Sequence, residues 1–265
     1  MRLEIKLLLL VFATGIFFSS CEKVVDVDLK DSEPKLVIEG EVSDEFKAHV
    51  VRISKTSSFA ESNKFNGLSG AQVVLSTPEG QQITFNEIRT GVYESPKFAG
   101  IPGGKYVLNV TLDGKLYTAS SVMPLAVKLD SLAFRKLSFF GDEVIVPLAF
   151  YKDPKAIKNQ YLFLVKARYK SVQEVLAEDR FTDGNDVTET LFTDLDELTE
   201  GDEVNVEMRV LDQNVYRYLF ALAQISGEGG PPVAPSNPKS NFDNGALGIF
   251  SAYTTSTIKQ EVKLN

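Results

Sequence analysis

The sequence is poor in the residues that catalytic and metal sites use most often. Its 265 residues contain one histidine, His49, one cysteine, Cys21, and no tryptophan. One cysteine cannot form an internal disulfide, and one histidine with one cysteine cannot complete a zinc site. The lack of tryptophan weakens the case for stacking on carbohydrates, although the 9 tyrosines and 18 phenylalanines can also stack on sugars.

Positive charge is also scarce. The chain has 28 Lys and Arg residues against 36 Asp and Glu residues, a formal net charge of -8, and it has no run of Lys and Arg longer than two. An acidic surface repels the phosphate backbone of nucleic acids and anionic lipid headgroups. We therefore expect no nucleic-acid partner.

The chain has no apolar run long enough for a permanent membrane span. The run from Leu7 to Phe18 follows Arg2 and Lys6. It is about a dozen residues long, whereas a spanning helix needs about 20. A short apolar run after basic residues is typical of a secretory signal peptide, so the sequence predicts one over residues 1–20.

The next residues, Phe18-Ser19-Ser20-Cys21, resemble the lipobox of bacterial lipoprotein signals, with Phe18 where Leu, Val or Ile is usual. The sole cysteine stands where a thioether-linked lipid is attached, and the Ala-x-Ala pattern of an ordinary secretory signal is missing. We predict lipidation of Cys21, a tether over residues 21–34, and anchoring to the outer membrane without a span. The alternative is an ordinary secretory signal that ends by chance at a cysteine.

Period-2 alternation predicts a mainly β body. Leu36, Ile38 and Val42 alternate with Glu39 and Glu41, the pattern of a half-buried strand. The same pattern and the turn signals between its repeats predict strands at residues 36–42, 48–54, 71–77, 81–85, 91–94, 105–112 and 116–122.

Short strands at this spacing are typical of a β-sandwich. The glycines and alternating apolar residues of 70–75, 91–93 and 104–110 resemble small Ig-like or transthyretin-like modules, which are usually structural or binding units. We predict an Ig-like β-sandwich over residues 35–123. Met123-Pro124 marks its end.

We expect a second β-rich domain with one helix over residues 124–265. Pro147 predicts an edge or a bulge in its strand. The acidic segment 171–201 is expected to form loops around one or two short elements. Asp212 can cap a helix that stops at Gly227, and a loop follows to Gly245. Further strands are expected at residues 128–137, 143–151, 159–170, 203–211, 246–253 and 257–264.

Several blocks of the mature chain resemble a Bacteroidetes lipoprotein family known as the domain of unknown function 4249. The blocks are residues 34–40, 152–154, 159–163, 201–207, 216–219 and 240–253. The most specific is the run Gly-Ala-Leu-Gly-Ile-Phe-x-Ala-Tyr from Gly245 to Tyr253. Family members are typically outer-membrane lipoproteins encoded beside TonB-dependent receptors. The resemblance therefore implies an accessory part in nutrient uptake, with such a receptor as partner, and it implies no enzymatic activity.

Reactive histidine and serine patterns are not evident. His49 lies in an alternating stretch, which favours a strand residue that is exposed or has its hydrogen bonds satisfied over a catalytic one. Gly67-Leu68-Ser69-Gly70 lacks the spacing of a nucleophile elbow. We therefore expect no catalytic residue.

Carboxylates are plentiful in the second half and are candidates for acid/base work or calcium binding. The glycine of the run from Asp183 to Asp186 comes too early for an EF-hand loop. We interpret the group as solvated loop charges, with no metal or cofactor. Its members are Asp179, Asp183, Asp186, Asp194, Asp196 and Glu197.

Two further motifs are weaker. The glycine-rich run from Ser226 to Gly230 follows a helix instead of opening one, so it is not a phosphate cradle, and the long loop that it begins is a candidate for binding. Asp130-Ser131-Leu132 resembles the acceptor of Bacteroidetes O-glycosylation.

Taken together, these patterns predict a non-enzymatic, lipid-anchored binding or accessory lipoprotein whose ligand they do not identify. The alternatives are an envelope hydrolase that uses carboxylates, and a structural or assembly subunit of a surface complex.

Overall fold

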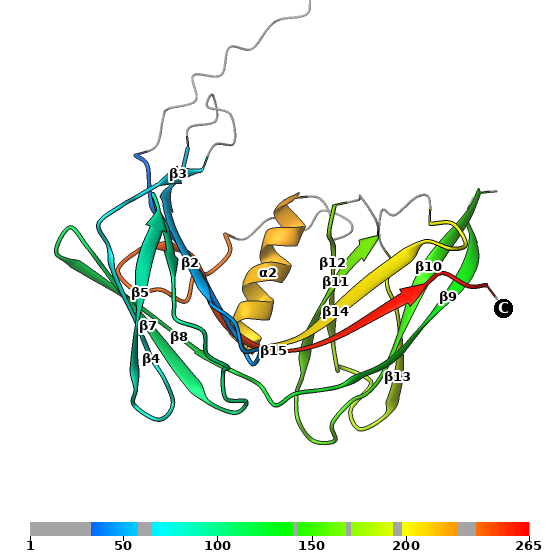
Figure 1. Cartoon of the computed structure of the whole chain (residues 1–265). Coiled ribbons are helices and arrows are strands. Elements are labelled where there is room, and N and C mark those ends of the chain that lie inside the picture. The colour runs from blue at the N-terminus through cyan, green and yellow to red at the C-terminus, as the bar shows by residue number, and fades with distance from the viewer. Residues whose placement is uncertain are drawn as a thin grey trace, which may run out of the picture. The chain divides into compact units, whose positions relative to one another are not determined.

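The computed structural model describes residues 33–57, 65–139, 142–167, 171–192, 198–226 and 237–264 (Figure 1). The predicted signal peptide, Cys21 and nearly all of the predicted tether lie outside these residues. Contacts divide the chain into residues 1–33 and a compact unit formed by Pro34–Asn265. In the described part of the chain, no helix has the length and apolar character needed to cross a membrane.

The fold is mainly β, as predicted from the period-2 alternation. The first half contains β1 (Leu36–Ser43), β2 (Val50–Lys55), β3 (Asn66–Gly67), β4 (Gln72–Ser76), β5 (Gln82–Arg89), β6 (Val92–Glu94), β7 (Lys105–Leu112) and β8 (Lys115–Val122). The second half contains β9 (Leu129–Phe139), β10 (Asp142–Lys152), β11 (Gln160–Ala167), β12 (Gln173–Glu178), β13 (Asp186–Thr190), β14 (Glu203–Leu211), α2 (Gln213–Ser226) and β15 (Leu247–Glu261).

Most strands belong to one sheet in the order β12-β11-β14-β15-β1-β2-β6-β5-β4-β7-β8, with β3 paired to β2. The strands from β15 to β8 enclose a first hydrophobic core, in which Ile38, Leu108 and Phe250 are fully buried. A separate three-stranded sheet, β13-β10-β9, packs against β11 and β14 around a second core that contains Tyr161 and Phe163. Each half therefore has the sandwich-like packing expected of alternating strands.

A single strand, β15, joins the two halves. Its first part, Leu247 to Tyr253, pairs in parallel with β1, and its second part, from Thr254, pairs antiparallel with β14. The partner changes where β1 ends, and there the Asp44 carboxylate accepts a hydrogen bond from Thr255 N at 3.0 Å. The prediction of two separate strands, at 246–253 and 257–264, is therefore wrong. The polar residues between them continue the strand, because threonine is favourable in strands.

The two predicted domains share β15 and lie within one compact unit. The predicted boundary at Met123-Pro124 falls between β8 and β9. Whether each half can exist as a separate domain stays a prediction.

Gly248 is required where β15 meets β1. Its φ is +92°, and a Cβ atom at this position would lie 2.1 Å from the carbonyl oxygen of Ile38, its partner in the parallel register. No side chain fits at that distance. The glycine within the most specific sequence block is therefore explained by close backbone approach.

Local signals of the second half are largely confirmed. The acidic segment forms two short strands, β12 and β13. The prediction of an edge strand or a bulge at Pro147 is wrong, because Pro147 lies in β10, the middle strand of its sheet, in regular register with Phe134 of β9. The strand tolerates the proline because β13 pairs with β10 only from Leu148 onward. The carbonyl oxygen of Pro147 points toward the end of β13, where it accepts a hydrogen bond from Leu191 N at 2.9 Å. In a strand the backbone nitrogen of a residue points to the same side as its carbonyl, so the missing N–H of Pro147 also lies on the β13 side. The β9 ladder therefore loses no donor.

Helix α2 begins as predicted. Asp212 accepts hydrogen bonds from Asn214 N at 2.8 Å and from Val122 N at 2.9 Å. The same carboxylate thus caps the helix and fastens it to β8. Val215 is buried against Leu211 and Tyr253, which places the helix on the sheet. The predicted stop at Gly227 lies outside the described residues.

The edge of β8 is closed by residues 240–245. Asp243 N donates a hydrogen bond to Thr118 O, and the Asp243 carboxylate accepts one from Thr118 N. The side-chain amide of Asn244 donates to Leu116 O at 2.8 Å. The Asn241 amide bonds to both backbone groups of Phe250, at 2.7 and 2.9 Å. This segment holds the end of the predicted loop firmly against the sheet.

Candidate functional site

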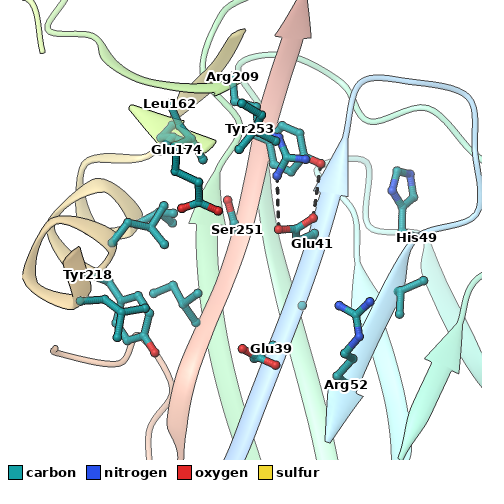
Figure 2. A pocket seen from close by; sticks show the side chains of 18 of the residues that line it. Glu39, Glu41, His49, Arg52, Leu162, Glu174, Arg209, Tyr218, Ser251 and Tyr253 are labelled. Carbon is teal, nitrogen blue, oxygen red and sulfur yellow. Dashed lines mark hydrogen bonds and ion pairs between the residues drawn. The ribbon is translucent and has the colours of Figure 1, made fainter. Parts of the chain in front are cut away.

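An open cleft of about 500 Å³ lies on the sheet surface between α2 and β2 and is here called the α2–β2 cleft (Figure 2). Its floor is formed by β1, β15, β14 and β11. Side chains alternate across a strand, so Glu39 and Glu41 of β1 face the cleft while Ile38 and Val42 enter the first core. The cleft therefore occupies the face of the long sheet that is turned away from the cores.

The two sides of the cleft differ in chemistry. On the α2 and β11 side the lining is mostly apolar and includes Leu162, Leu164, Leu219 and Leu222, with the polar groups of Glu174 and Tyr218 beside them. The opposite side is polar, and Figure 2 shows Glu39, Glu41, His49 and Arg52 on it. The cleft thus suits a ligand with one apolar and one polar side.

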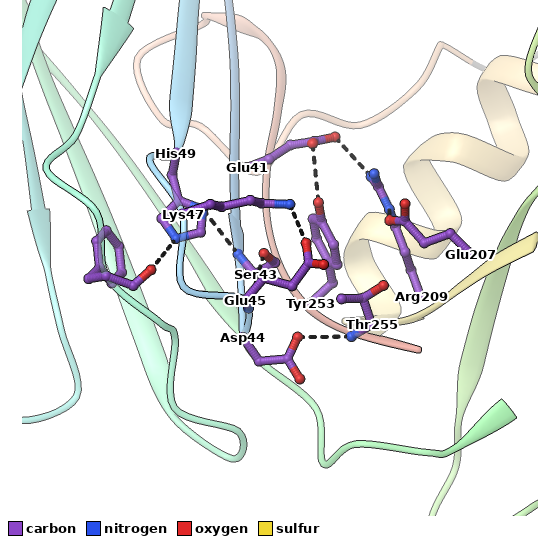
Figure 3. A network of polar contacts seen from close by, with 11 residues as sticks. Glu41, Ser43, Asp44, Glu45, Lys47, His49, Glu207, Arg209, Tyr253 and Thr255 are labelled. Atoms are coloured by element: carbon purple, nitrogen blue, oxygen red, sulfur yellow. Dashed lines mark hydrogen bonds and ion pairs between the residues drawn. The ribbon is translucent and has the colours of Figure 1, made fainter. Parts of the chain in front are cut away.

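A network of charged and aromatic groups lies at one end of the cleft (Figure 3). Arg209 donates from Nε to Glu207 at 2.6 Å and from Nη1 to Glu41 at 3.3 Å. Its guanidinium carbon lies 4.2 Å from the centre of the Tyr253 ring, and the Tyr253 hydroxyl donates to the other oxygen of Glu41 at 3.5 Å. The side chain of Arg209 is only 15% exposed, so the surrounding groups hold it in one position.

The electrostatics of this network keep Arg209 charged. Burial lowers the pKa of its guanidinium, but the negative charges of Glu41 and Glu207 outweigh that effect and hold the pKa above its usual value. Burial, reinforced by Glu41, raises the pKa of the Tyr253 hydroxyl. Tyr253 therefore remains a neutral hydrogen-bond donor at physiological pH.

His49 has its hydrogen bonds satisfied, as its place in the alternating stretch predicts. The imidazole is buried, its Nε2 lies 3.0 Å from Phe98 O, and its Nδ1 lies 3.4 Å from Ser43 N. Because a carbonyl accepts and an amide donates, Nε2 carries the proton and Nδ1 accepts. Burial lowers the pKa of His49, which favours this neutral form. Within the described residues, no hydroxyl is bonded to the ring.

The turn that contains Ser69 also has a structural role. The Ser69 hydroxyl donates to Glu87 at 2.6 Å, and the same carboxylate accepts from Gly70 N and Gly91 N. The hydrogen bond from Ser69 is the main reason that the pKa of Glu87 is lowered. The carboxylate thus joins two turns.

The acidic residues of the second half contain a cluster that the sequence did not reveal. Carboxylate oxygens of Asp153, Asp179 and Asp183 all lie within 4.8 Å of one another. Asp153 and Asp179 are buried and Asp183 is exposed. The prediction of solvated loop charges is therefore wrong for Asp179 and confirmed for Asp183, whereas Asp186 is exposed but begins strand β13. Asp194, Asp196 and Glu197 lie outside the described residues.

Each carboxylate of this acidic cluster has a protein partner. The Tyr161 hydroxyl donates to Asp153, Asn159 N donates to Asp179 at 2.9 Å, and Ala156 N donates to Asp183 at 2.6 Å. Burial is the main cause that raises the pKa of Asp153. Oxygen ligands at this spacing can accept a hard cation such as Ca²⁺. The bonds within the cluster also fix the connection between β10 and β11.

Asp130-Ser131-Leu132 lies in β9, with Asp130 and Ser131 exposed and Leu132 buried. Its glycosylation stays a prediction.

Comparison with known proteins identifies the family. A family model described as a domain of unknown function, DUF4249, matches residues 22–259. The chain belongs to the DUF4249 family. The DUF4249 match spans the α2–β2 cleft, the Arg209 network and the acidic cluster, so all three are features of the family region of this chain.

No match was found among curated proteins. Among solved structures, this DUF4249 chain is similar to a DUF4785 family protein from Legionella pneumophila, with 12% sequence identity and a TM-score of 0.28. The similarity covers 66% of this chain and 52% of the Legionella chain. At that level it carries no argument about function.

The cleft of the DUF4249 chain was missed because its groups come from distant strands. Glu41, Arg209 and Tyr253 each stand at an outward position of an alternating strand, which is the ordinary place for a polar residue. The one available signal was that Tyr253 ends the most specific block of the family resemblance.

Proposed function

We propose that this DUF4249 protein is a lipid-anchored, non-enzymatic binding subunit of the bacterial outer membrane. It is held by lipid on Cys21 and works with a TonB-dependent receptor in nutrient uptake. The lipobox-like residues before Cys21 support the anchor, since more than one acyl chain on a cysteine gives stable membrane residence.

The observation that carries the binding role is the α2–β2 cleft. Its volume of about 500 Å³ lies in the range of small-molecule sites. Arg209 is bonded to two carboxylates and stacked on Tyr253, so the polar end of the cleft is organised before a ligand arrives. Such preorganisation reduces the entropy lost on binding.

The apolar side of the cleft would supply most of the affinity. Burying apolar surface contributes about 25 cal/mol per Å², and Leu219 and Leu222 of α2 offer such surface opposite Glu39 and Arg52. The polar side would then orient the ligand.

Co-purification with the receptor tests this function. The tagged full chain is solubilised from native membranes, and its partners are identified by mass spectrometry. We expect a TonB-dependent receptor in stoichiometric amount with the wild-type chain. Recovery of the chain without such a receptor would contradict the proposal.

The anchor is tested separately with labelled palmitate. We expect incorporation into the wild-type chain and none into Cys21→Ala. Equal labelling of both proteins would show that Cys21 is not the lipidated residue.

The acidic cluster favours a second candidate function, an envelope hydrolase that uses carboxylates. Asp153 has a raised pKa and lies beside two further carboxylates, an arrangement found in acid/base sites. If the chain is such a hydrolase, the variant Asp153→Asn should lose its activity and keep its fold. Turnover of envelope glycans or esters by the wild-type chain, abolished in this variant, would favour the hydrolase over the binding subunit.

A further inference from the structure

A second cavity, of about 530 Å³, shares the side chain of Tyr218 with the α2–β2 cleft. We call it the basic pocket. Its lining comes from α2, from Ser120 of β8 and from residues 237–241. It is separate from the Arg209 network and from the acidic cluster.

Both sides of the basic pocket are fixed by local structure. Asn214, Arg217, Tyr218 and Ala221 are spaced three, four and seven residues apart, which places them on one face of α2. On the other side, the Asn241 amide donates to Ser120 O at 3.2 Å and is bonded to the backbone of β15. The cavity thus lies between a capped helix and a segment fastened to the sheet.

The charge of this pocket is opposite to that of the whole chain. Among the described residues that line it, only Arg217 and Lys239 are charged, and both are positive, although the chain carries a formal net charge of -8. Over the described residues, neither forms an ion pair with a carboxylate. Glu178, which lines a neighbouring cavity with Arg217, is instead paired with Arg180. Arg209 of the cleft, by contrast, has two carboxylate partners.

The remaining polar groups are neutral. The amides of Asn214 and Asn237 and the hydroxyl of Tyr218 line the pocket, and burial raises the pKa of that hydroxyl, which keeps it protonated. Amides and hydroxyls both donate and accept hydrogen bonds, as sugar hydroxyls require. A guanidinium matches the two oxygens of a carboxylate or phosphate.

We propose that the basic pocket binds a small hydroxylated anion of the sugar-acid or sugar-phosphate class. Arg217 and Lys239 bind the oxyanion, and Asn214, Asn237 and Tyr218 bind the hydroxyl groups. The cavity volume lies in the range of sites for molecules of this size. This site goes beyond the proposed function, because it requires neither the lipid anchor nor a receptor.

Isothermal titration calorimetry of the full chain in detergent, at low salt, tests the site with three probes: glucuronate, glucose 6-phosphate and glucose. We expect at least one of the two anions to bind and glucose to bind at least about tenfold more weakly, since charge-assisted hydrogen bonds contribute about 1.5–3 kcal/mol. Raising the salt concentration should weaken binding of the anion.

Variants locate the site. Arg217→Gln and Lys239→Gln should each weaken binding of the anion about tenfold or more, on the same grounds. Arg89→Gln and Lys105→Gln remove exposed cations elsewhere and should leave binding unchanged.

Three results would overturn the proposal: no binding of either anion, equal binding of glucose, or affinities unaltered by Arg217→Gln and Lys239→Gln. Binding of glucose 6-phosphate without glucuronate would support it and identify phosphate as the preferred oxyanion. Thermal melts of each variant confirm that the exposed substitutions leave the fold intact. Failure here leaves the co-purification test of the proposed function unaffected.

Discussion

Replacing Gly248 by alanine tests whether the parallel pairing of β1 and β15 holds the two halves together. The backbone at this position has φ +92°, and a Cβ would lie 2.1 Å from Ile38 O and 2.8 Å from Ile38 C. Both contacts are with backbone, so no side-chain rotation can relieve them. β15 must move away from β1 to accommodate the methyl group.

The expected loss has two parts. The left-handed conformation costs a non-glycine residue about 1–2 kcal/mol. Displacing the strand weakens about two backbone hydrogen bonds at about 1 kcal/mol each and disturbs the packing of Phe250 in the first core. The free energy of unfolding should therefore fall by about 3–5 kcal/mol, which corresponds to a drop in Tm of roughly 6–20 °C for a unit of this size.

Gly245→Ala is the matched control. Gly245 has φ +80°, and nothing lies within 4 Å of its hypothetical Cβ, so only the conformational cost applies. Its Tm should fall by roughly 2–8 °C. Thermal unfolding followed by circular dichroism and calorimetry measures both variants. If Gly248→Ala is no less stable than Gly245→Ala, the close approach of the two backbones is not a constraint on the fold.

Substitutions at three further residues probe individual groups. The pKa of His49 is lowered in the folded protein, so His49 contributes stability above its unfolded pKa of about 6.5 that is lost as the pH falls through its folded value. The stability difference between wild type and His49→Gln should therefore shrink on acidification in urea titrations, and a constant difference would contradict the assignment of the neutral ring. Asp183→Asn keeps the acceptor for Ala156 N but removes one of three neighbouring negative charges. We expect a higher Tm at pH 7 and no gain near pH 3, and a lower Tm at pH 7 would indicate that the cluster holds a cation. Asp212→Ala removes the helix cap and the bond to Val122 N and should cost about 1–2 kcal/mol, whereas Asp212→Asn should recover part of that loss.

The regular strands were predictable because their signal is local. The predicted ranges 105–112 and 203–211 coincide with β7 and β14, where buried apolar residues alternate with residues that are mostly half-buried. The helix start was predictable from Asp212 for the same reason. β3 was missed because it contains only two residues, Asn66 and Gly67, which is too short for an alternation of apolar and polar residues.

The site and the seam between the halves could not be predicted in this way, because they depend on long-range pairing. Nothing local in β15 indicates that the backbone of Tyr253 pairs with β1 whereas that of Thr254 pairs with β14. Asp153 and Asp179 come from different elements, and only the fold brings their carboxylates together. The residue types could mark these side chains as candidate site residues, but which side chains meet depends on the strand topology.

The shared strand also orders events during biogenesis. Glu41 and Tyr253, which meet on neighbouring strands in the floor of the cleft, are 212 positions apart. Until the polypeptide beyond Leu247 emerges, β1 lacks its parallel neighbour and the interior of the first half lacks Phe250 and Ala252. A chain whose last strand is not yet available would therefore leave the edge of β1 unpaired and the first core incomplete. An unpaired strand edge of this kind favours pairing with a second copy of the chain until β15 is in place.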